Sequence, residues 1–183
     1  MRVTGVVREV VIFVLLAVVI VLPIRFFIAQ PFVVQGESMH PTFENGDYLI
    51  IDELSYDFSA PRRGDVVVFR YPGDTSVFYI KRIIGLPGET VRITKGVVNI
   101  QRADGSDLAL ESEPYISAED ATYTLSTSLG QGEYFVMGDN RPNSSDSRVW
   151  GTLPEKDIMG RVFLRLLPAS AVGAFPGAAS VPQ

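Results

Sequence analysis

One short stretch of the sequence, FVVQGESMHPTF at residues 32–43, contains residue types suited to nucleophilic hydrolysis. Ser38 lies between Gly36 and Pro41, which together predict a rigid, exposed turn of the kind that presents a nucleophile. His40, the only histidine of the chain, would share a face with Ser38 on extended backbone. A catalytic base needs a third group to orient it, however, and the flanking residues offer none. The pattern could present Ser38 as a nucleophile, although an ordinary loop serine is the commoner interpretation of such a stretch, and it favours His40 as an ordinary polar residue.

A second candidate base is Lys81, in the apolar stretch VFYIKRIIGL at residues 77–86. If this stretch is a strand, alternation places Lys81 on one face with Tyr79 and Ile83. Apolar neighbours remove water from a lysine and lower its pKa, and a neutral amine can deprotonate a serine hydroxyl. A lysine on a solvated strand face is the commoner arrangement, and alternation alone does not separate the two. The opposite face would carry Phe78, Ile80 and Arg82.

The third candidate segment, GDNRPNSSDSRVWG at residues 138–151, concentrates charged and hydroxyl side chains in one turn-rich stretch. One interpretation is a surface loop held by local hydrogen bonds between side chains and backbone. The other is a loop whose ion pairs hold a hydroxyl against a buried amine. Asp146 and Arg148 are spaced to pair, and an exposed pair of this kind contributes little stability.

The composition argues against several classes of function. A net charge of −5 and the absence of a long basic run argue against a nucleic-acid binder. With no cysteine and one histidine, the chain is expected to have neither disulfides nor a zinc site. Apolar residues make up 46% of the 183, which is enough for a packed core. We expect one domain plus an extra segment, with no cofactor and no metal.

The extra segment is N-terminal. Residues 10–22 are all apolar, and residues 26–29 extend the run to about 20 residues, roughly the span of a bilayer core. A cleaved signal peptide fits poorly, because the best cleavage site, after Ala29, has Phe27 at −3. Residues 1–29 are therefore predicted to form a cytoplasmic stub and a retained transmembrane helix. Arginines before the run favour a cytoplasmic N-terminus.

The sequence after this segment is typical of β-strands. Short runs rich in Val, Ile, Tyr and Phe are bounded by Gly, Pro and Asp. The dipeptides Lys95-Gly96 and Asp104-Gly105 indicate hairpin tips. The expected strands are residues 46–54, 63–71, 77–86, 89–100, 132–140 and 160–168, with a short run at 32–34.

Two stretches lack the strand pattern. Residues 117–131 are polar and weakly patterned, which predicts a loop-rich excursion, and residues 169–183 are expected to be a flexible tail. We predict an all-β fold, in which residues 30–168 form an irregular antiparallel, barrel-like catalytic domain after a single N-terminal transmembrane helix.

Three of these stretches together resemble the motifs of type I signal peptidases, which are membrane-anchored serine proteases with a Ser/Lys dyad. GESMHPTF is similar to their serine box, and RRGDVVVF with YIKRIIGLPGE is similar to their lysine box. GDNRPNSSDSRVWGTLP with GRV is similar to their C-terminal box. Each motif is weak alone, but together they occur in the family's order and cover most of residues 6–166.

The resemblance implies a serine endopeptidase that removes N-terminal signal peptides from secreted preproteins and cleaves after Ala-x-Ala. It implies that Ser38 is the nucleophile, that Lys81 is the general base, and that the Ser38 N–H forms part of the oxyanion hole. The implied supporting residues are Ser144, which would orient the lysine amine, and the ion pairs of Asp146 with Arg148 and of Asp139 with Arg82.

The resemblance also implies the surroundings of the enzyme. It would lie in the bacterial plasma membrane, with its N-terminus cytoplasmic, its catalytic domain outside the cytoplasm, and the secretion machinery nearby. Its substrate, the extended signal-peptide segment, would bind by strand addition, with small residues at −1 and −3. No nucleic acid or metal is implied as a partner. The implied substrate-binding residues are Phe32, Val34, Gly36, Met39, Tyr79 and Ile80.

One position leaves the oxyanion hole open. Some family members carry a serine where this chain has Gly36, and its hydroxyl is the second oxyanion donor; other members carry glycine, as here. A water molecule or a backbone N–H could replace that donor.

Three other interpretations compete with the housekeeping peptidase. A self-cleaving repressor-type Ser/Lys domain would carry a soluble DNA-binding segment in place of the membrane segment. A peptidase specialised for pilins or conjugation would use the same dyad, although the full C-terminal box favours the housekeeping enzyme. A catalytically inactive, membrane-tethered binding module is disfavoured because Ser38, Lys81 and Ser144 are all retained.

Overall fold

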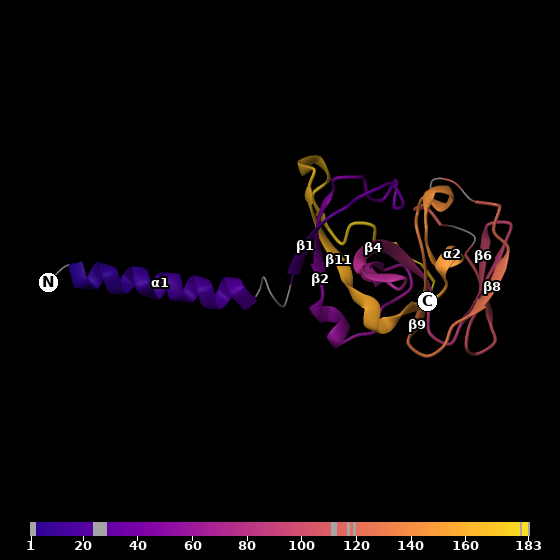
Figure 1. The fold of residues 1–183 in the computed structure, drawn as a ribbon, viewed down its shortest axis with the longest axis horizontal. Helices are drawn as coiled ribbons and strands as arrows, with labels where there is room; N and C mark the ends of the chain where they lie inside the picture. The colour runs from indigo at the N-terminus through magenta and orange to yellow at the C-terminus, as the bar shows by residue number, and fades with distance from the viewer. Residues whose placement is uncertain are drawn as a thin grey trace.

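The computed structural model describes residues 3–23, 29–110, 113–116, 118, 120–179 and 181–182. Helix α1 (Val3–Pro23) extends away from a β-rich domain (Figure 1). Its side chains are described for residues 6–19, and the large apolar ones are exposed, with Phe13 at 74%. Among the residues described, no helix is both long and apolar enough to cross a membrane. The predicted anchor also includes residues 1–2 and 24–28, which lie outside the described part of the chain.

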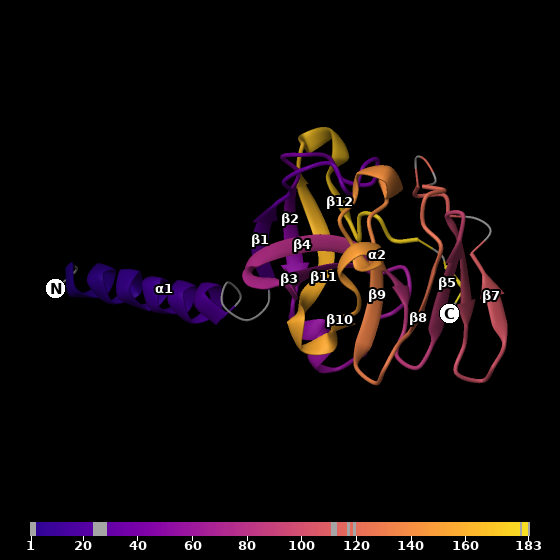
Figure 2. The ribbon, with the colours of Figure 1, turned by 45° about the vertical axis from the view of Figure 1, so that its right-hand side comes forward.

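The domain contains two antiparallel sheets, a larger one next to α1 and a smaller one farther away (Figure 2). Within the described residues, the larger sheet has the order β1-β2-β11-β3-β4-β9-β10 with β12 paired to β11, and the smaller has the order β7-β6-β5-β8. The strands of the larger sheet are β1 (Ala29–Val33), β2 (Tyr48–Asp52), β3 (Val66–Tyr71), β4 (Asp74–Gly85), β9 (Glu133–Met137), β10 (Leu153–Pro154), β11 (Ile158–Leu167) and β12 (Gly173–Ala174). Those of the smaller sheet are β5 (Thr90–Thr94), β6 (Val97–Gln101), β7 (Asp107–Ala109) and β8 (Leu125–Ser128).

Short helical turns connect several strands. They are the 3-10 turns η2 (Leu54–Asp57), η3 (Arg141–Asn143), η4 (Glu155–Asp157) and η5 (Ala169–Ala171), and the single α-turn α2 (Ser147–Trp150).

The two sheets confirm the mostly β character that was predicted from the alternating runs. Lys95 and Gly96, with φ of 48° and 86°, form the tip between β5 and β6, as expected for a two-residue hairpin loop.

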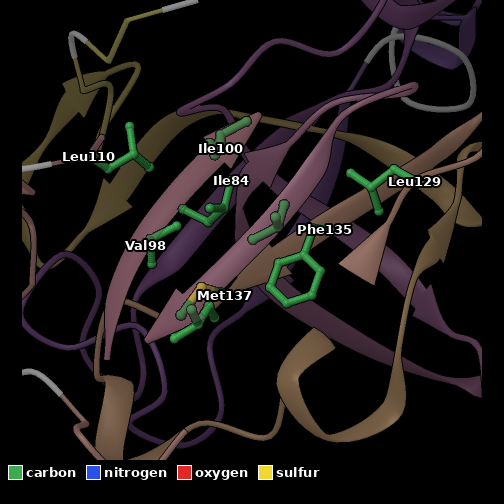
Figure 3. Packing of buried hydrophobic residues seen from close by; sticks show 9 residues of the cluster. Ile84, Val98, Ile100, Leu110, Leu129, Phe135 and Met137 are labelled. Carbon is green, nitrogen blue, oxygen red and sulfur yellow. The ribbon is translucent and has the colours of Figure 1, made fainter. Parts of the chain in front are cut away.

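The two sheets share a buried apolar cluster. Figure 3 shows Ile84 of β4 with Phe135 and Met137 of β9 packed against residues of the smaller sheet, including Val98 and Ile100 of β6. The strands that lead into the candidate site therefore rest on the second sheet, and their position depends on it.

A second cluster lies beneath the turn that carries Ser38. Met39 and Phe43, which are 1% and 0% exposed, pack against Leu49 and Ile51 of β2. Burial of two large side chains within five residues holds this turn against the sheet, and truncating either to alanine would cost about 2–5 kcal/mol.

Two stretches that were predicted to be irregular contain some regular structure. The stretch 117–131, of which residues 117 and 119 lie outside the described part, contains strand β8, which pairs with β5. The outward residues of β8 are Ser126 and Ser128, and these polar residues hide the alternation. The tail after residue 168 is attached to the domain, because β12 pairs with β11 and backbone carbonyls of the tail accept hydrogen bonds from buried arginines.

Candidate active site

The first component of the site is the turn between β1 and β2. It begins at Gly36, whose φ of +88° is in the left-handed region that favours glycine. The Gly36 N–H donates to Asn45 Oδ1 at 2.9 Å, and the His40 N–H donates to the Glu37 carbonyl at 3.1 Å. Ser38 is half-buried at the turn, where its hydroxyl faces the next component.

The second component is Lys81 on β4, which is only 4% exposed. Its Nζ donates to Ser38 Oγ at 2.8 Å and to the Ile80 carbonyl at 2.9 Å. The Tyr79 ring centroid lies 5.2 Å from the same nitrogen. Burial lowers the pKa of Lys81 to about 8, although the negative charges of Asp146 and Asp139 act in the opposite direction. Near neutral pH a useful fraction of Lys81 is therefore the neutral amine that a general base requires.

The third component is the loop that follows β9. Asp139 accepts hydrogen bonds from Arg82 Nε and Nη2 at 2.8 and 2.6 Å, and both side chains are fully buried. Thr42 Oγ1 donates to Asp139 Oδ2 at 2.5 Å, which connects this loop to the serine turn. The second predicted pair is also formed, with Arg148 Nε 2.8 Å from Asp146 Oδ1. The side chains of Arg148 and Asp146 are 2% and 0% exposed, so this ion pair is buried and is not a weak surface pair.

Ser144 lies close to the dyad but makes no hydrogen bond among the described residues. Its Oγ is buried and without a partner. A β-carbon added at Gly138 would lie 2.3 Å from that Oγ and 2.5 Å from the Ser38 carbonyl, so Gly138 is what lets Ser144 approach. The expected contact between Ser144 and the lysine amine is not among the hydrogen bonds of this structure, and the role of Ser144 remains a prediction.

Three site residues were missed by the sequence reasoning: Asn45, Thr42 and Asn140. Asn140 donates its backbone N–H to the Ser38 carbonyl at 3.0 Å and its Nδ2 to the Glu37 carbonyl at 3.0 Å. It therefore joins the loop after β9 to the serine turn. All three lie within or next to the recognised motifs, but their bonds are to backbone or to partners distant in sequence, which leave no local pattern.

The free backbone donor of the site is the Ser38 N–H, which has no hydrogen-bond partner among the described residues. It is available for an oxyanion that forms at the nucleophile. The Gly36 N–H is not available in the same way, because Asn45 accepts its hydrogen bond. A β-carbon added at Gly36 would meet nothing within 4 Å, so there is room for a side chain. The position favours glycine because its backbone is left-handed.

A cleft of about 590 Å³ lies beside the dyad. Within the described residues β1 pairs only with β2, and residues 74–80 of β4 pair only with β3, so both cleft walls have a free strand edge. Of the predicted substrate-binding residues, Met39 does not line the cleft, because it packs in the core beneath the turn. The others do line it: Phe32, Val34, Gly36, Tyr79 and Ile80, joined by Val33, Gln35, Glu37, Leu49, Val68, Ser76, Val77, Phe78, Asn143 and Ser145.

No cluster of three or more metal-ligating side chains occurs in the described part of the chain. A hydroxyl bonded to a buried lysine, next to a cleft with two free strand edges, defines a serine endopeptidase by its fold and site.

The comparisons with known proteins give the family. The family model "Signal peptidase, peptidase S26" matches residues 7–167. The chain is 41% identical over 176 residues to the probable signal peptidase I-1 of Synechocystis sp., covering 92% of this chain and 86% of that protein. It is 38% identical over 159 residues to signal peptidase I T of Bacillus subtilis, covering 80% and 78%. The chain belongs to the signal peptidase family S26.

A solved structure is also similar. The crystal structure of a signal peptidase I from Enterococcus faecalis is 32% identical in sequence, with a TM-score of 0.46, and the match covers 56% of this chain and 97% of that one.

Proposed function

We propose that this protein removes N-terminal signal peptides from secreted preproteins, cleaving after small residues of an Ala-x-Ala site by a Ser38/Lys81 dyad. The observation that supports this most directly is the 2.8 Å hydrogen bond between Lys81 Nζ and Ser38 Oγ. It combines with the lowered pKa of Lys81, about 8, to give a poised base beside a nucleophile.

The reaction proceeds in two halves. In the first, the neutral Lys81 amine accepts the Ser38 proton while Oγ attacks the scissile carbonyl, and the resulting ammonium then protonates the leaving amine. In the second, Lys81 accepts a proton from the water that attacks the acyl-enzyme, the bond between Ser38 Oγ and the acyl carbon breaks, and the Lys81 ammonium returns the proton to Oγ. The free Ser38 N–H donates to the oxyanion in both halves. Ser144, whose buried hydroxyl has no partner, is the candidate for orienting the amine.

The substrate binds as an added strand between β1 and β4. Its main chain pairs with the free edges of these strands, while Phe32, Val34 and Ile80 form apolar walls around its side chains. The side chains at −1 and −3 would lie against these apolar walls, which line the same cleft as Ser38 and Lys81. Met39 contributes indirectly, by holding the serine turn on the core.

We further propose that α1, with the apolar residues that follow it, anchors the enzyme in the bacterial plasma membrane with its N-terminus in the cytoplasm. The proposal is supported by the apolar run at residues 10–22 and by exposed apolar side chains such as Phe13. The domain then lies outside the cytoplasm, near the secretion machinery that delivers preproteins. Retention of the protein in membranes after alkaline extraction would support the anchor, and its full release would contradict it.

The decisive experiment uses the purified full chain in detergent with a preprotein that has an Ala-x-Ala site. We expect cleavage after the second alanine, no cleavage by Ser38→Ala, and no cleavage when −1 or −3 of the substrate is made bulky. Equal cleavage of the bulky substrates would contradict the specificity. Cleavage by Ser38→Ala would contradict the nucleophile.

A further inference from the structure

The C-terminal strap, which we define as residues 173–179 and 181–182, makes contacts that the proposed reaction does not use. Figure 2 shows it in yellow, passing from β12 toward the smaller sheet. It lies beyond residue 167, the last residue matched by the family model. The strap is therefore a feature of this chain that the family match does not describe.

The strap is attached at both of its ends. At its start, β12 pairs with β11, and the Phe175 N–H donates to the Phe163 carbonyl at 2.7 Å. Near its end, the Pro182 carbonyl accepts a hydrogen bond of 2.9 Å from Arg63 Nε, and Val181 packs against the apolar cluster shared by the two sheets. These attachments hold both ends of the strap on the domain.

The middle of the strap contacts the lysine-bearing strand. Arg82 Nη1 donates to the Gly177 carbonyl at 2.6 Å and to the Gly64 carbonyl at 2.9 Å. The remaining hydrogen bonds of this guanidinium are to Asp139. Arg82 is fully buried and is the next residue after Lys81, so loss of the Gly177 carbonyl would leave an N–H unpaired directly behind the proposed base.

The same glycine contacts the serine-bearing turn. Gly177 has a φ of +78°, and a β-carbon added to it would lie 2.6 Å from Thr42 Cγ2 and 3.2 Å from Phe43 Cε2. Thr42 is hydrogen-bonded to Asp139, the partner of Arg82. Gly177 therefore lies where the structural supports of both halves of the dyad meet.

We propose that the C-terminal strap is a positioning element, which holds Arg82 and the serine turn together and keeps water away from the face of β4 behind Lys81. The strap is not among the residues that line the cleft, so it acts through other residues and not on substrate. This inference rests on the proposed Ser38/Lys81 dyad and adds the segment that keeps it aligned.

The proposal predicts a specific change in the protonation of Lys81. Opening the strap would let water reach the Arg82–Asp139 pair. Lys81 would then be less buried, and the Arg82 guanidinium would neutralise less of the negative charge of Asp139. Both effects favour the ammonium form of Lys81 and raise its pKa. The groups that face Lys81 are the Ser38 hydroxyl, the Ile80 carbonyl, the Tyr79 ring and the carboxylates of Asp139 and Asp146, whereas Arg82 lies on the opposite face of β4.

The test compares two glycine-to-alanine variants of the full chain. Gly177→Ala forces a clash in a left-handed position, whereas Gly173→Ala adds a methyl group with nothing within 4 Å, in the same strap. The pH dependence of kcat/KM for cleavage of the preprotein is measured for both. A chain that ends at Pro176 removes the Gly177 carbonyl without any clash, and serves if Gly177→Ala does not fold.

We expect Gly177→Ala, or the shortened chain, to move the midpoint of the acid limb upward by about half a pH unit or more, and to lower kcat about tenfold with little change in KM. Gly173→Ala should match the wild type. A smaller fraction of active enzyme would lower the rate without moving the midpoint of the acid limb. If that midpoint does not move in Gly177→Ala, or in the shortened chain that replaces it, the proposal is overturned. Failure of the dyad itself is recognised separately, because the Ser38→Ala variant would then still cleave the preprotein.

Discussion

Lys81 and Arg82 are neighbours on β4, and the two faces of the strand use their charges differently. Both side chains are buried, at 4% and 0% exposure. Arg82 makes two hydrogen bonds to the Asp139 carboxylate, whereas Lys81 donates to a hydroxyl and a carbonyl and has no carboxylate within its hydrogen bonds. Burial lowers the pKa of Lys81 to about 8.

The difference shows how one strand separates structure from chemistry. A buried cation with a bidentate carboxylate stays charged and holds parts of the fold together. A buried cation without such a partner is destabilised in its charged form, and that destabilisation makes it a base. Asp139 and Asp146 are near enough to oppose the shift but do not contact the amine.

The largest expected effect comes from removing the base. Lys81→Met should lower kcat/KM by about 10⁴-fold or more, because no other described group contacts Ser38 Oγ as a base. The same variant should be more stable than the wild type at pH 6–7, by about 1–3 kcal/mol, because it removes a cation that burial disfavours. Peptide-cleavage kinetics and urea unfolding measure the two quantities.

Lys156→Met is the matched control for this substitution, since Lys156 is exposed. It should change neither activity nor stability appreciably. Activity of Lys81→Met above about 1% of the wild type would contradict the distinction between the two faces, because another group would then serve as the base.

The second effect concerns the other face of β4. Asp139→Asn leaves Arg82 buried without its counter-charge, and the free energy of unfolding should fall by about 3–5 kcal/mol. Asp107→Asn is the control, because the pair of Asp107 with Arg92 is 71% and 47% exposed and should contribute less than about 1 kcal/mol. Urea unfolding measures the loss of unfolding free energy in each variant. Equal losses would show that the buried pair contributes no more to stability than the exposed pair does.

Much of the fold was predictable because burial on one face of a strand leaves alternation in the sequence. The hairpin at Lys95-Gly96 and the runs that became β3 and β4 are examples. Strand β8 was missed because its outward residues are Ser126 and Ser128, which are typical of loops. The strap was missed because its main attachments are backbone carbonyls, which carry no residue signature.

The site was predictable to a similar degree. Alternation placed Lys81 with Tyr79, in agreement with the 5.2 Å contact between them, but whether Lys81 is buried depends on the turn that covers it from 43 residues away in sequence. Met39 was expected in the cleft because the family resemblance implied that its position lines the substrate pockets; the turn instead directs it into the core. Backbone geometry decides that direction, and the residue type does not reveal it.

The third effect is the pH dependence of the reaction. Protonated Lys81 cannot accept the Ser38 proton, so kcat/KM should rise about tenfold per unit below pH 8 and level off above it. For stability, the unfolded chain holds the Lys81 proton up to the ordinary lysine pKa of 10.5, whereas the folded chain releases it near 8, so the free energy of unfolding rises with pH between these values. Asp139→Asn sharpens the comparison, because losing that negative charge lowers the pKa of Lys81 and moves the acid limb to lower pH.

The smallest effect is expected at His40, the only histidine of the chain, which lies two residues from the nucleophile. Its Nε2 lies 3.4 Å from Glu44 Oε1, with the two side chains 45% and 60% exposed, and it makes no hydrogen bond to Ser38 among the described residues. A surface pair of this kind contributes about 0.2–0.5 kcal/mol, so His40→Ala should change stability by no more than that and kcat/KM by less than about twofold. The position matters because His40 lies two residues from the nucleophile, yet its side chain contacts the Glu44 carboxylate and not Ser38. A tenfold loss of kcat/KM in His40→Ala, with the acid limb moved away from pH 8, would transfer the role of base to His40 and leave Lys81 as a second structural cation like Arg82.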